Sequence, residues 1–170
     1  MRKGKILLIA MFCVGFISCI KQSPQLPSNK VIVINTENAA LLRINKSLTN
    51  KEDSLIRILA ERKKSFKKNN IGFWYRIFKS GKGALVTDSA ICSFDFQLSK
   101  LDEKQIQAGH KVIIIGKKQS VTGLEEGLKM MHKGDSATFI IPWYLAYGMT
   151  GDGGLIPPYT SLIYKLKLNN

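Results

Sequence analysis

Residues 121–130 read VTGLEEGLKM and predict a short amphipathic helix. Leu124, Leu128 and Met131 recur at helical spacing, so the predicted helix, residues 123–131, has one apolar face. An apolar face of this kind is normally buried against another element of the same domain. The helix is therefore expected to lie against a core that the rest of the chain provides.

Two charged residues and a glycine complete this stretch. Glu125 and Lys129 stand four residues apart and are expected to pair across one helical turn. Gly134 follows and is expected to act as the C-cap, because glycine readily adopts the left-handed conformation found at helix ends. These features predict a helix of only a few turns.

The sequence around this helix has the character of β-strands. Five stretches carry it: residues 72–78, 92–98, 112–115, 137–141 and 162–168. The first is rich in aromatic and β-branched residues, and the second and the last alternate apolar with polar side chains. Pro142 is expected to end the fourth, because proline lacks the N–H that a strand ladder needs. The pattern predicts an α+β domain in which an antiparallel sheet packs against one short helix.

A helical extension is predicted before the sheet, over residues 36–68. Thr49 and Glu52 have the spacing of a capping box, in which the first residue caps a helix and the second reaches back to it. Apolar residues then follow at helical spacing: Leu55, Ile56, Leu59 and Phe66. This part of the extension is therefore expected to begin as a new helix at Thr49.

An earlier helix of the same extension, residues 36–48, is expected to bury Leu41, Leu42 and Ile44. The later helix is crowded with basic residues: Arg57, Arg62, Lys63, Lys64, Lys67 and Lys68. We interpret them as a solvated face, and a specific contact with an anionic glycan or lipid remains the alternative. Residues 36–68 also offer a surface through which two copies of the chain could form a homodimer.

The first nineteen residues have the pattern of a bacterial lipoprotein leader. Three basic residues precede the apolar run 6–16, which is too short to span a bilayer but suits a secretory signal. Ser18 then stands before Cys19, as a small residue does before the acylated cysteine of a lipobox. We expect a lipoprotein signal peptide over residues 1–18, lipidation of Cys19 and a tether over residues 19–35. An uncleaved anchor or an ordinary signal peptide is the alternative.

Charge and cysteine content narrow the choice of partners. The chain has 26 lysine and arginine residues against 12 aspartate and glutamate residues. Nucleic acid is not expected as a partner, because an exported protein held on the periplasmic or cell-surface face of a bacterial membrane rarely meets it. Cys92 lies in an alternating pattern and is expected to be a packed core thiol. No cluster of histidine and cysteine predicts a metal site, and no cofactor is expected.

The helix and the segments after it resemble one known family. Residues 121–130, the Ile-Pro pair 141–142, the Ala-Tyr-Gly triplet 146–148, the loop 151–158 and the strand 161–166 are similar in order and spacing to FKBP-type peptidyl-prolyl isomerases. The resemblance implies a half-barrel, a curved antiparallel sheet wrapped around the short helix. It implies an isomerase domain over residues 71–170, preceded by the helical extension, residues 36–70.

The resemblance also implies a pocket made of eight residues. Phe96, Ile106 and Tyr164 would form its walls and Leu124 its floor, while Val121 and Ile156 would close its sides. The Val121 N–H and the Tyr147 hydroxyl would reach the substrate carbonyls, and Gln107 occupies the position of the family's wall aspartate. The implied catalytic set is Tyr147, Phe96, Leu124 and Tyr164, and the implied substrate-binding set is Ile106, Gln107, Val121 and Ile156. The simpler interpretation is that these residues only belong to the core or the surface of an inert half-barrel.

The chemistry implied needs no nucleophile, metal or cofactor. Rotation about a peptide bond has a barrier of about 18–20 kcal/mol, because resonance gives the bond partial double-bond character. Twisting the bond removes the charge separation of the planar amide, so a dry apolar pocket disfavours the planar form more than the twisted one. For a bond preceding proline both end states matter, because they differ by only about 0.5–1 kcal/mol.

Several positions depart from the family pattern. Gln107 replaces an aspartate, Leu124 a tryptophan, Phe96 a tyrosine, and Lys111 stands where an aromatic residue is usual, after a shortened loop. These changes predict a shallower pocket. They motivate an alternative function, a non-catalytic chaperone or assembly factor on the same scaffold.

The overall arrangement is similar to that of lipoprotein isomerases associated with gliding motility. The similarity lies in the leader, the charged extension and the Gly-Phe-Trp-Tyr start of the sheet at residues 72–75. It implies that the partners are proline-containing protein clients in the cell envelope.

Overall fold

The computed structural model describes residues 36–63, 65–78 and 81–169. Contacts within the chain separate Met1–Ala39 from Ala40–Asn170, and the second of these forms a compact unit. The expected signal peptide, Cys19 and the tether all lie outside the described residues. Among the residues that are described, no helix combines the length and the apolar character that crossing a membrane requires.

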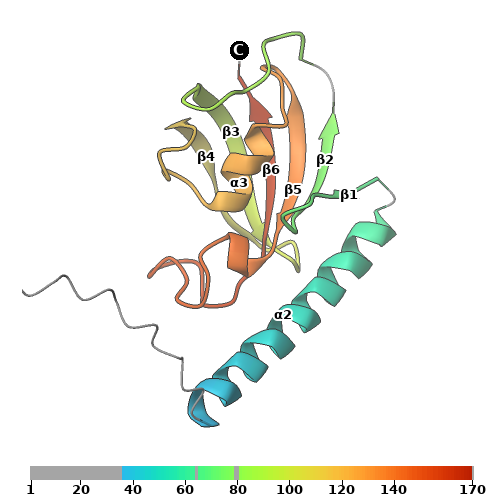
Figure 1. Ribbon diagram of the computed structural model, residues 1–170. Helices are drawn as coiled ribbons and strands as arrows, with labels where there is room; N and C mark the ends of the chain where they lie inside the picture. Colours follow the sequence, from blue (N-terminus) through green and yellow to red (C-terminus); the bar gives the residue numbers. More distant parts are fainter. Residues whose placement is uncertain (1–35, 64, 79–80, 170) are drawn as a thin grey trace, which may run out of the picture. The chain divides into compact units, whose positions relative to one another are not determined.

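The compact unit is built on one antiparallel sheet of six strands in the order β1-β2-β5-β6-β3-β4 (Figure 1). The strands are β1 (Lys67–Lys68), β2 (Trp74–Phe78), β3 (Ile91–Lys100), β4 (Gln105–Ile114), β5 (Ser136–Ile141) and β6 (Leu162–Leu168). The helical elements are α2 (Thr36–Arg62), α3 (Thr122–Leu128) and the 3₁₀ turn η1 (Trp143–Leu145). This architecture confirms the predicted α+β fold with a short helix against the sheet.

Helix α3 lies against one face of the curved sheet, where the main core is (Figure 1). Leu124 and Leu128 on α3 are buried there with Phe139 of β5. The helix lies very close to β5, because a Cβ added at Gly127 would stand 2.8 Å from the Phe139 ring. Glycine at this position therefore allows the close packing that positions α3.

The end of α3 differs from the prediction. The helix ends at Leu128, with Lys129 as its C-cap, and Gly134 is not the cap. Gly134 instead occupies a later turn with a φ of +90°, and its N–H donates to the carbonyl of Leu168. The sequence correctly placed a left-handed glycine in this region but assigned it to the wrong turn.

The predicted pair between Glu125 and Lys129 is also wrong. The carboxylate of Glu125 is buried and accepts hydrogen bonds from the backbone N–H groups of Gly116, at 3.0 Å, and Ser120, at 3.1 Å. Lys129 pairs with Glu126, at 2.6 Å, and with Asp88, at 3.6 Å. Glu125 thus ties the loop before α3 to the helix, because its carboxylate satisfies backbone donors that the loop leaves without partners.

Strand β4 is much longer than the short strand predicted at residues 112–115. It begins at Gln105 and pairs with β3 from Ile91↔Ile114 to Ser99↔Gln105. Its first half is mostly exposed, as befits the edge strand of a sheet, and Ile106 is the one large apolar side chain there, so the apolar pattern is too weak to be recognised. The strand bears on the predicted pocket because it carries Ile106 and Gln107.

Helix α2 is one continuous helix of 27 residues, and the predicted break at Thr49 does not occur. The Thr49 hydroxyl donates to the carbonyl of Asn45, 2.9 Å away, and so bonds back along the helix instead of capping a new one. The helix ends at Arg62, and Lys67–Lys68 form a strand paired with β2 where a helix was predicted.

The buried side of α2 is formed by its second half. Ile56 and Ala60 pack with Ile140 of β5 and Ile163 of β6 in a second, smaller core. By contrast, Leu41, Leu42 and Ile44 are 60%, 61% and 54% exposed, so the prediction that they are buried is wrong. Within the described part of the compact unit, the half of the helix that reaches Ile140 and Ile163 is the half that has buried apolar partners.

Candidate active site

The main core opens into a cavity of about 240 Å³ beside α3. Five of the eight predicted pocket residues line it: Phe96, Gln107, Leu124, Tyr147 and Tyr164. They come from β3, β4, α3, the segment after η1 and β6. The fold therefore brings together residues that are up to 68 positions apart in the sequence, Phe96 and Tyr164 being the most distant pair.

The floor and walls of the cavity are apolar and aromatic. Leu124 is buried at the start of α3, and Tyr164 is buried on β6. The ring centroids of Phe96 and Tyr164 lie 6.2 Å apart, and those of Phe94 and Phe96 are separated by the same distance. The antiparallel register Phe96↔Leu166 and Leu98↔Tyr164 places these neighbouring strands side by side. Phe94 was not singled out from the sequence, although its place two residues before Phe96 puts it on the same face.

Two tyrosine hydroxyls supply polar groups to this apolar surface. Burial raises the pKa of the Tyr164 phenol, and the neighbouring Tyr147 raises it further. Tyr164 therefore keeps its proton at physiological pH and can donate a hydrogen bond. Tyr147 is only half-buried, so its side chain borders both the core and the opening of the cavity.

The other three predicted residues do not line this cavity. Val121 lines an adjoining cavity of about 340 Å³, which shares Lys111, Ser120 and Tyr147 with the first. Ile156 is buried in the main core, and Ile106 packs against that core from β4. Among the described residues, none accepts a hydrogen bond from the Val121 N–H, which had been expected to reach a substrate carbonyl.

Lys111 places a positive charge at the edge of both cavities. Its Nζ donates to the carbonyl of Gln119, 3.1 Å away, which holds the side chain across the loop before α3. Lys111 stands at the position where an aromatic residue is usual in the family that the sequence resembles. His110 and Ser120, which also line the first cavity, were not anticipated, because neither stands in a recognisable motif.

Asp152 organises the loop that follows Tyr147. Its Oδ1 accepts hydrogen bonds from the N–H groups of Ile156, at 2.7 Å, and Gly154, at 2.9 Å. These bonds lower the pKa of the carboxyl, the one from Ile156 most. Gly151, with a φ of +73°, lies so near the Ile156 carbonyl that an added Cβ would stand 2.2 Å from its oxygen. The Gly-Asp-Gly-Gly stretch at residues 151–154 is thus a built turn that fixes Ile156.

The described residues offer no grouping of three or more His, Cys, Asp or Glu side chains that would suit a metal ion. Cys92 is buried in the main core, and that burial raises the pKa of its thiol. The cavity can therefore bind an apolar chain segment and present hydroxyl donors to the carbonyls of that segment.

Comparison with protein families gives one match that covers half of the chain. The family described as FKBP-type peptidyl-prolyl cis-trans isomerase matches residues 82–169. This range contains all eight residues of the predicted pocket.

Individual relatives are similar over most of the described residues. FkpA, an FKBP-type peptidyl-prolyl cis-trans isomerase of Escherichia coli, is 28% identical over 110 residues, which are 63% of this chain and 40% of FkpA. A probable FKBP-type isomerase of Haemophilus influenzae is 30% identical over 109 residues, or 62% of this chain and 45% of that protein. The chain thus spans less than half of the length of these curated relatives.

Solved structures share the fold. The crystal structure of FkpA from Escherichia coli superposes with a TM-score of 0.63 at 23% identity, covering 79% of this chain and 65% of FkpA. An isomerase from Pseudomonas syringae gives a TM-score of 0.65 at 20% identity, covering 74% of this chain and 93% of that structure.

Proposed function

Because the chain belongs to the FKBP-type peptidyl-prolyl cis-trans isomerase family, we propose that its cavity beside α3 catalyses rotation about Xaa-Pro bonds of protein clients. The observation that carries the proposal is the pairing of an apolar floor and aromatic wall with two tyrosine hydroxyls in a single cavity. The curated relatives that match are themselves named as isomerases of this type.

The geometry suits isomerisation for a simple physical reason. A proline ring bound among Phe96, Leu124 and Tyr164 is removed from water. The planar amide is charge-separated and depends on hydration more than the twisted amide does, so this burial disfavours the planar form more. In this proposal the Tyr147 hydroxyl, from the lining of the same cavity, donates to a carbonyl of the bound chain. A donor that fits the twisted bond better than the planar one lowers the barrier without any covalent step.

The decisive experiment measures isomerisation of short peptides that carry different residues before proline. The full chain is expected to accelerate the reaction, and Tyr147→Phe is expected to lose about tenfold in kcat/KM, the equivalent of one hydrogen bond of about 1.4 kcal/mol. Tyr75→Phe is the matched control, since Tyr75 lies on β2 and does not line the cavity. Full activity in Tyr147→Phe would contradict the role given to this hydroxyl.

A non-catalytic chaperone or assembly factor is the second candidate. Lys111 favours it, because a charged side chain at the edge of a small cavity disfavours an apolar peptide there. On this hypothesis the protein suppresses aggregation of unfolded clients while isomerising no Xaa-Pro peptide, and Tyr147→Phe leaves that suppression intact. Its clients would be proline-containing envelope proteins, and those of a gliding machinery are one candidate set.

Export and lipidation complete the proposal. They are supported by the basic start, the apolar run 6–16 and the Ser18-Cys19 pair. The protein would then stay on a membrane surface through its acyl chains, with its isomerase domain outside the cytoplasm. Metabolic labelling with palmitate is expected to mark the wild-type chain and not Cys19→Ala, which should move to the soluble fraction. Equal labelling of both proteins would exclude Cys19 as the site.

A further inference from the structure

The segment 143–159 carries two predicted site residues, Tyr147 and Ile156, and both of its ends contact helix α2. At one end the Tyr144 hydroxyl donates to Oδ1 of Asp53, 3.0 Å away. At the other end the Tyr159 hydroxyl donates to Oδ1 of Asn45, 3.4 Å away. Asn45 and Asp53 stand eight residues apart on α2, about two helical turns, so one helix holds both ends.

Trp143 joins the two ends of this segment to each other. Its ring centroid lies 5.6 Å from that of Tyr144 and 4.9 Å from that of Tyr159, and both pairs are close to edge-on. The Trp143 carbonyl accepts from the N–H of Gly148, and the Gly148 carbonyl accepts from the N–H of Tyr159. These contacts tie the beginning and the end of the loop to each other, with Tyr147 between them.

The bond between Tyr144 and Asp53 is partly buried. A hydroxyl that donates to a carboxylate makes a stronger bond than one between neutral groups. Gly72, with a φ of +115°, lies so close to the ring that an added Cβ would stand 3.1 Å from the Tyr144 oxygen. Burial, and then the bond to Asp53, raises the pKa of Tyr144, so the phenol stays protonated and remains a donor.

Helix α2 is itself firmly attached to the sheet. Ile56 and Ala60 are buried against Ile140 and Ile163, and Asp53 lies one turn before Ile56. Beyond the end of α2, Lys63 forms an ion pair with Glu103 in the turn between β3 and β4. A helix anchored in this way provides a fixed reference for the loop that it holds.

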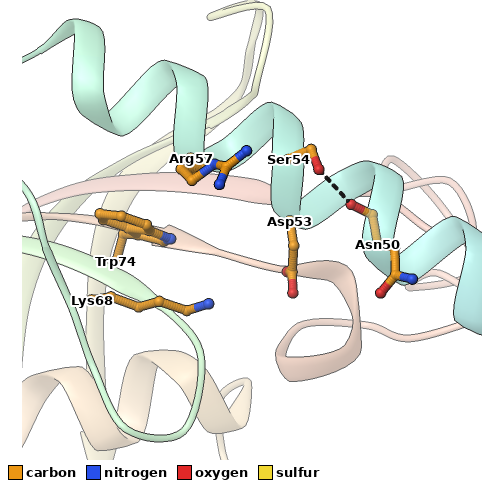
Figure 2. Close-up of a pocket in the computed structure, with 6 residues that line it drawn as sticks. All are labelled: Asn50, Asp53, Ser54, Arg57, Lys68 and Trp74. Atoms are coloured by element: carbon orange, nitrogen blue, oxygen red, sulfur yellow. Dashed lines mark hydrogen bonds between the residues drawn. The ribbon is translucent and has the colours of Figure 1, made fainter.

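On the side of β1 and β2 the contact is open. A cavity of about 490 Å³ is lined there by Asn50, Asp53, Ser54, Arg57, Lys68 and Trp74. Figure 2 shows Trp74 and Lys68 lying across an opening from Asn50, Ser54 and Arg57 of α2. Because this side is open, no packing there would compensate for the hydrogen bond between Asp53 and Tyr144. Removing that bond is therefore expected to loosen the loop 143–159.

We propose that Asp53, with Asn45, is a positioning residue of the isomerase: through Tyr144 and Tyr159, α2 holds the loop 143–159 so that the Tyr147 hydroxyl stays at the cavity. This inference rests on the proposed function for its catalytic consequence. It also has a purely structural consequence, the order of the loop, which can be measured without any substrate.

The test compares three variants in the full chain. Asp53→Ala removes the acceptor, Asp53→Asn keeps an oxygen that can accept from Tyr144, and Glu61→Ala removes an exposed carboxylate elsewhere on α2. We expect Asp53→Ala to lose about threefold to tenfold in kcat/KM, mostly through kcat, because a misplaced catalytic group slows the bound substrate. Asp53→Asn should recover most of the activity, and Glu61→Ala should equal the wild type.

Amide hydrogen exchange is measured on the same proteins. In Asp53→Ala, exchange is expected to rise in peptides from 143–159 and to stay unchanged in β3 and β4. Adding Tyr144→Phe to Asp53→Ala should cause no further loss of activity, because both substitutions remove the same bond. A purely destabilising substitution would instead raise exchange throughout the sheet.

The outcomes separate this inference from the proposed function. If the wild type is active and Asp53→Ala matches it in both kcat/KM and loop exchange, the positioning role is overturned. If the wild type isomerises no peptide, the proposed function fails, and exchange alone decides about the loop. Faster exchange confined to 143–159 then supports its positioning by α2, and unchanged exchange overturns it.

Discussion

Tyr164 shows how the position of one residue sets its chemistry. On β6 it lies between the main core and the cavity, where its ring faces Phe96 and its hydroxyl lies beside Tyr147. The same phenol on the surface would be an ordinary polar group. Burial raises the pKa of this phenol and so keeps it a donor at higher pH than an exposed tyrosine, because the charged form is the one that burial disfavours.

The raised pKa values of Tyr144 and Tyr164 predict a loss of stability at high pH. Above pH 10, their ordinary value, both tyrosines ionise in the unfolded chain while the folded chain keeps the protons. The unfolded state then binds fewer protons than the native state, so the free energy of unfolding falls as pH rises. Urea unfolding between pH 8 and about 11 should show this decline.

Tyr164→Phe is the variant that checks this prediction. It is expected to have a smaller slope of unfolding free energy against pH above about pH 10, because one of the two shifted groups is gone. The same slope as in the wild type would show that Tyr164 does not ionise more readily in the unfolded chain. Below pH 9 the free energies of unfolding of the wild type and Tyr164→Phe should differ by an amount that does not change with pH.

At the scale of elements, the packing of α3 on β5 depends on the absence of a side chain at Gly127. Gly127→Ala would place a Cβ 2.8 Å from the Phe139 ring. Overpacking of this kind costs about 1–3 kcal/mol, and the better helix propensity of alanine returns about 1 kcal/mol. We expect a net destabilisation of about 1 kcal/mol or slightly more.

The matched control for Gly127→Ala is Gly109→Ala on β4. A Cβ added at Gly109 would have no heavy atom within 4 Å. Its effect on the urea midpoint should be small, within about 0.5 kcal/mol, as is usual for exposed positions. Equal destabilisation by the two substitutions would contradict the close approach of α3 to β5.

Strand and helix periodicity predicted the sheet and α3 but not the course of α2. The alternation in residues 162–168 is real, yet Ile163, on the side of Lys165 and Lys167, is buried because α2 covers it. The capping signature at Thr49 and Glu52 is overridden, since Thr49 bonds back to Asn45 within a continuous helix. Tertiary packing, which a local sequence pattern does not contain, thus decides the structure at these positions.

The residues of the candidate site could be predicted from the sequence where they stand in recognisable motifs. Tyr147 and Leu124 stand in recognisable stretches, and the structure brings them to one cavity with Phe96, Gln107 and Tyr164. The bond between Asp53 and Tyr144 could not be predicted, because it joins residues 91 positions apart, neither of which belongs to a motif. Long-range polar contacts of this kind depend on how α2 docks.

At the scale of the whole molecule, the exposed apolar residues of α2 bear on oligomeric state. Leu41, Leu42 and Ile44 lie in the first half of the helix, before its buried contacts begin. Exposed apolar groups gathered on one element often mark a protein interface. Our prediction of a homodimer through residues 36–68 therefore places its contact on this half of α2.

Light scattering on the purified protein measures this directly. A dimeric mass that falls to that of a monomer in a Leu41→Lys, Leu42→Lys double variant is the expected result. Leu155→Lys is a suitable control, because Leu155 is equally exposed but lies in the loop 151–158. A monomeric mass for the wild type at every concentration would refute the homodimer.

The docking of α2 on the sheet also determines where the chain can be cut. A protein shortened to start at residue 71 would keep the cavity, but it would lay bare Ile140 and Ile163 and leave Tyr144 without its acceptor. Such a truncated form is expected to aggregate, because it exposes apolar surface to water. A poor yield of this fragment would therefore say nothing about the activity of the folded domain. The smallest fragment of this chain suited to the isomerisation assay is therefore expected to begin before Asn45 and to keep helix α2.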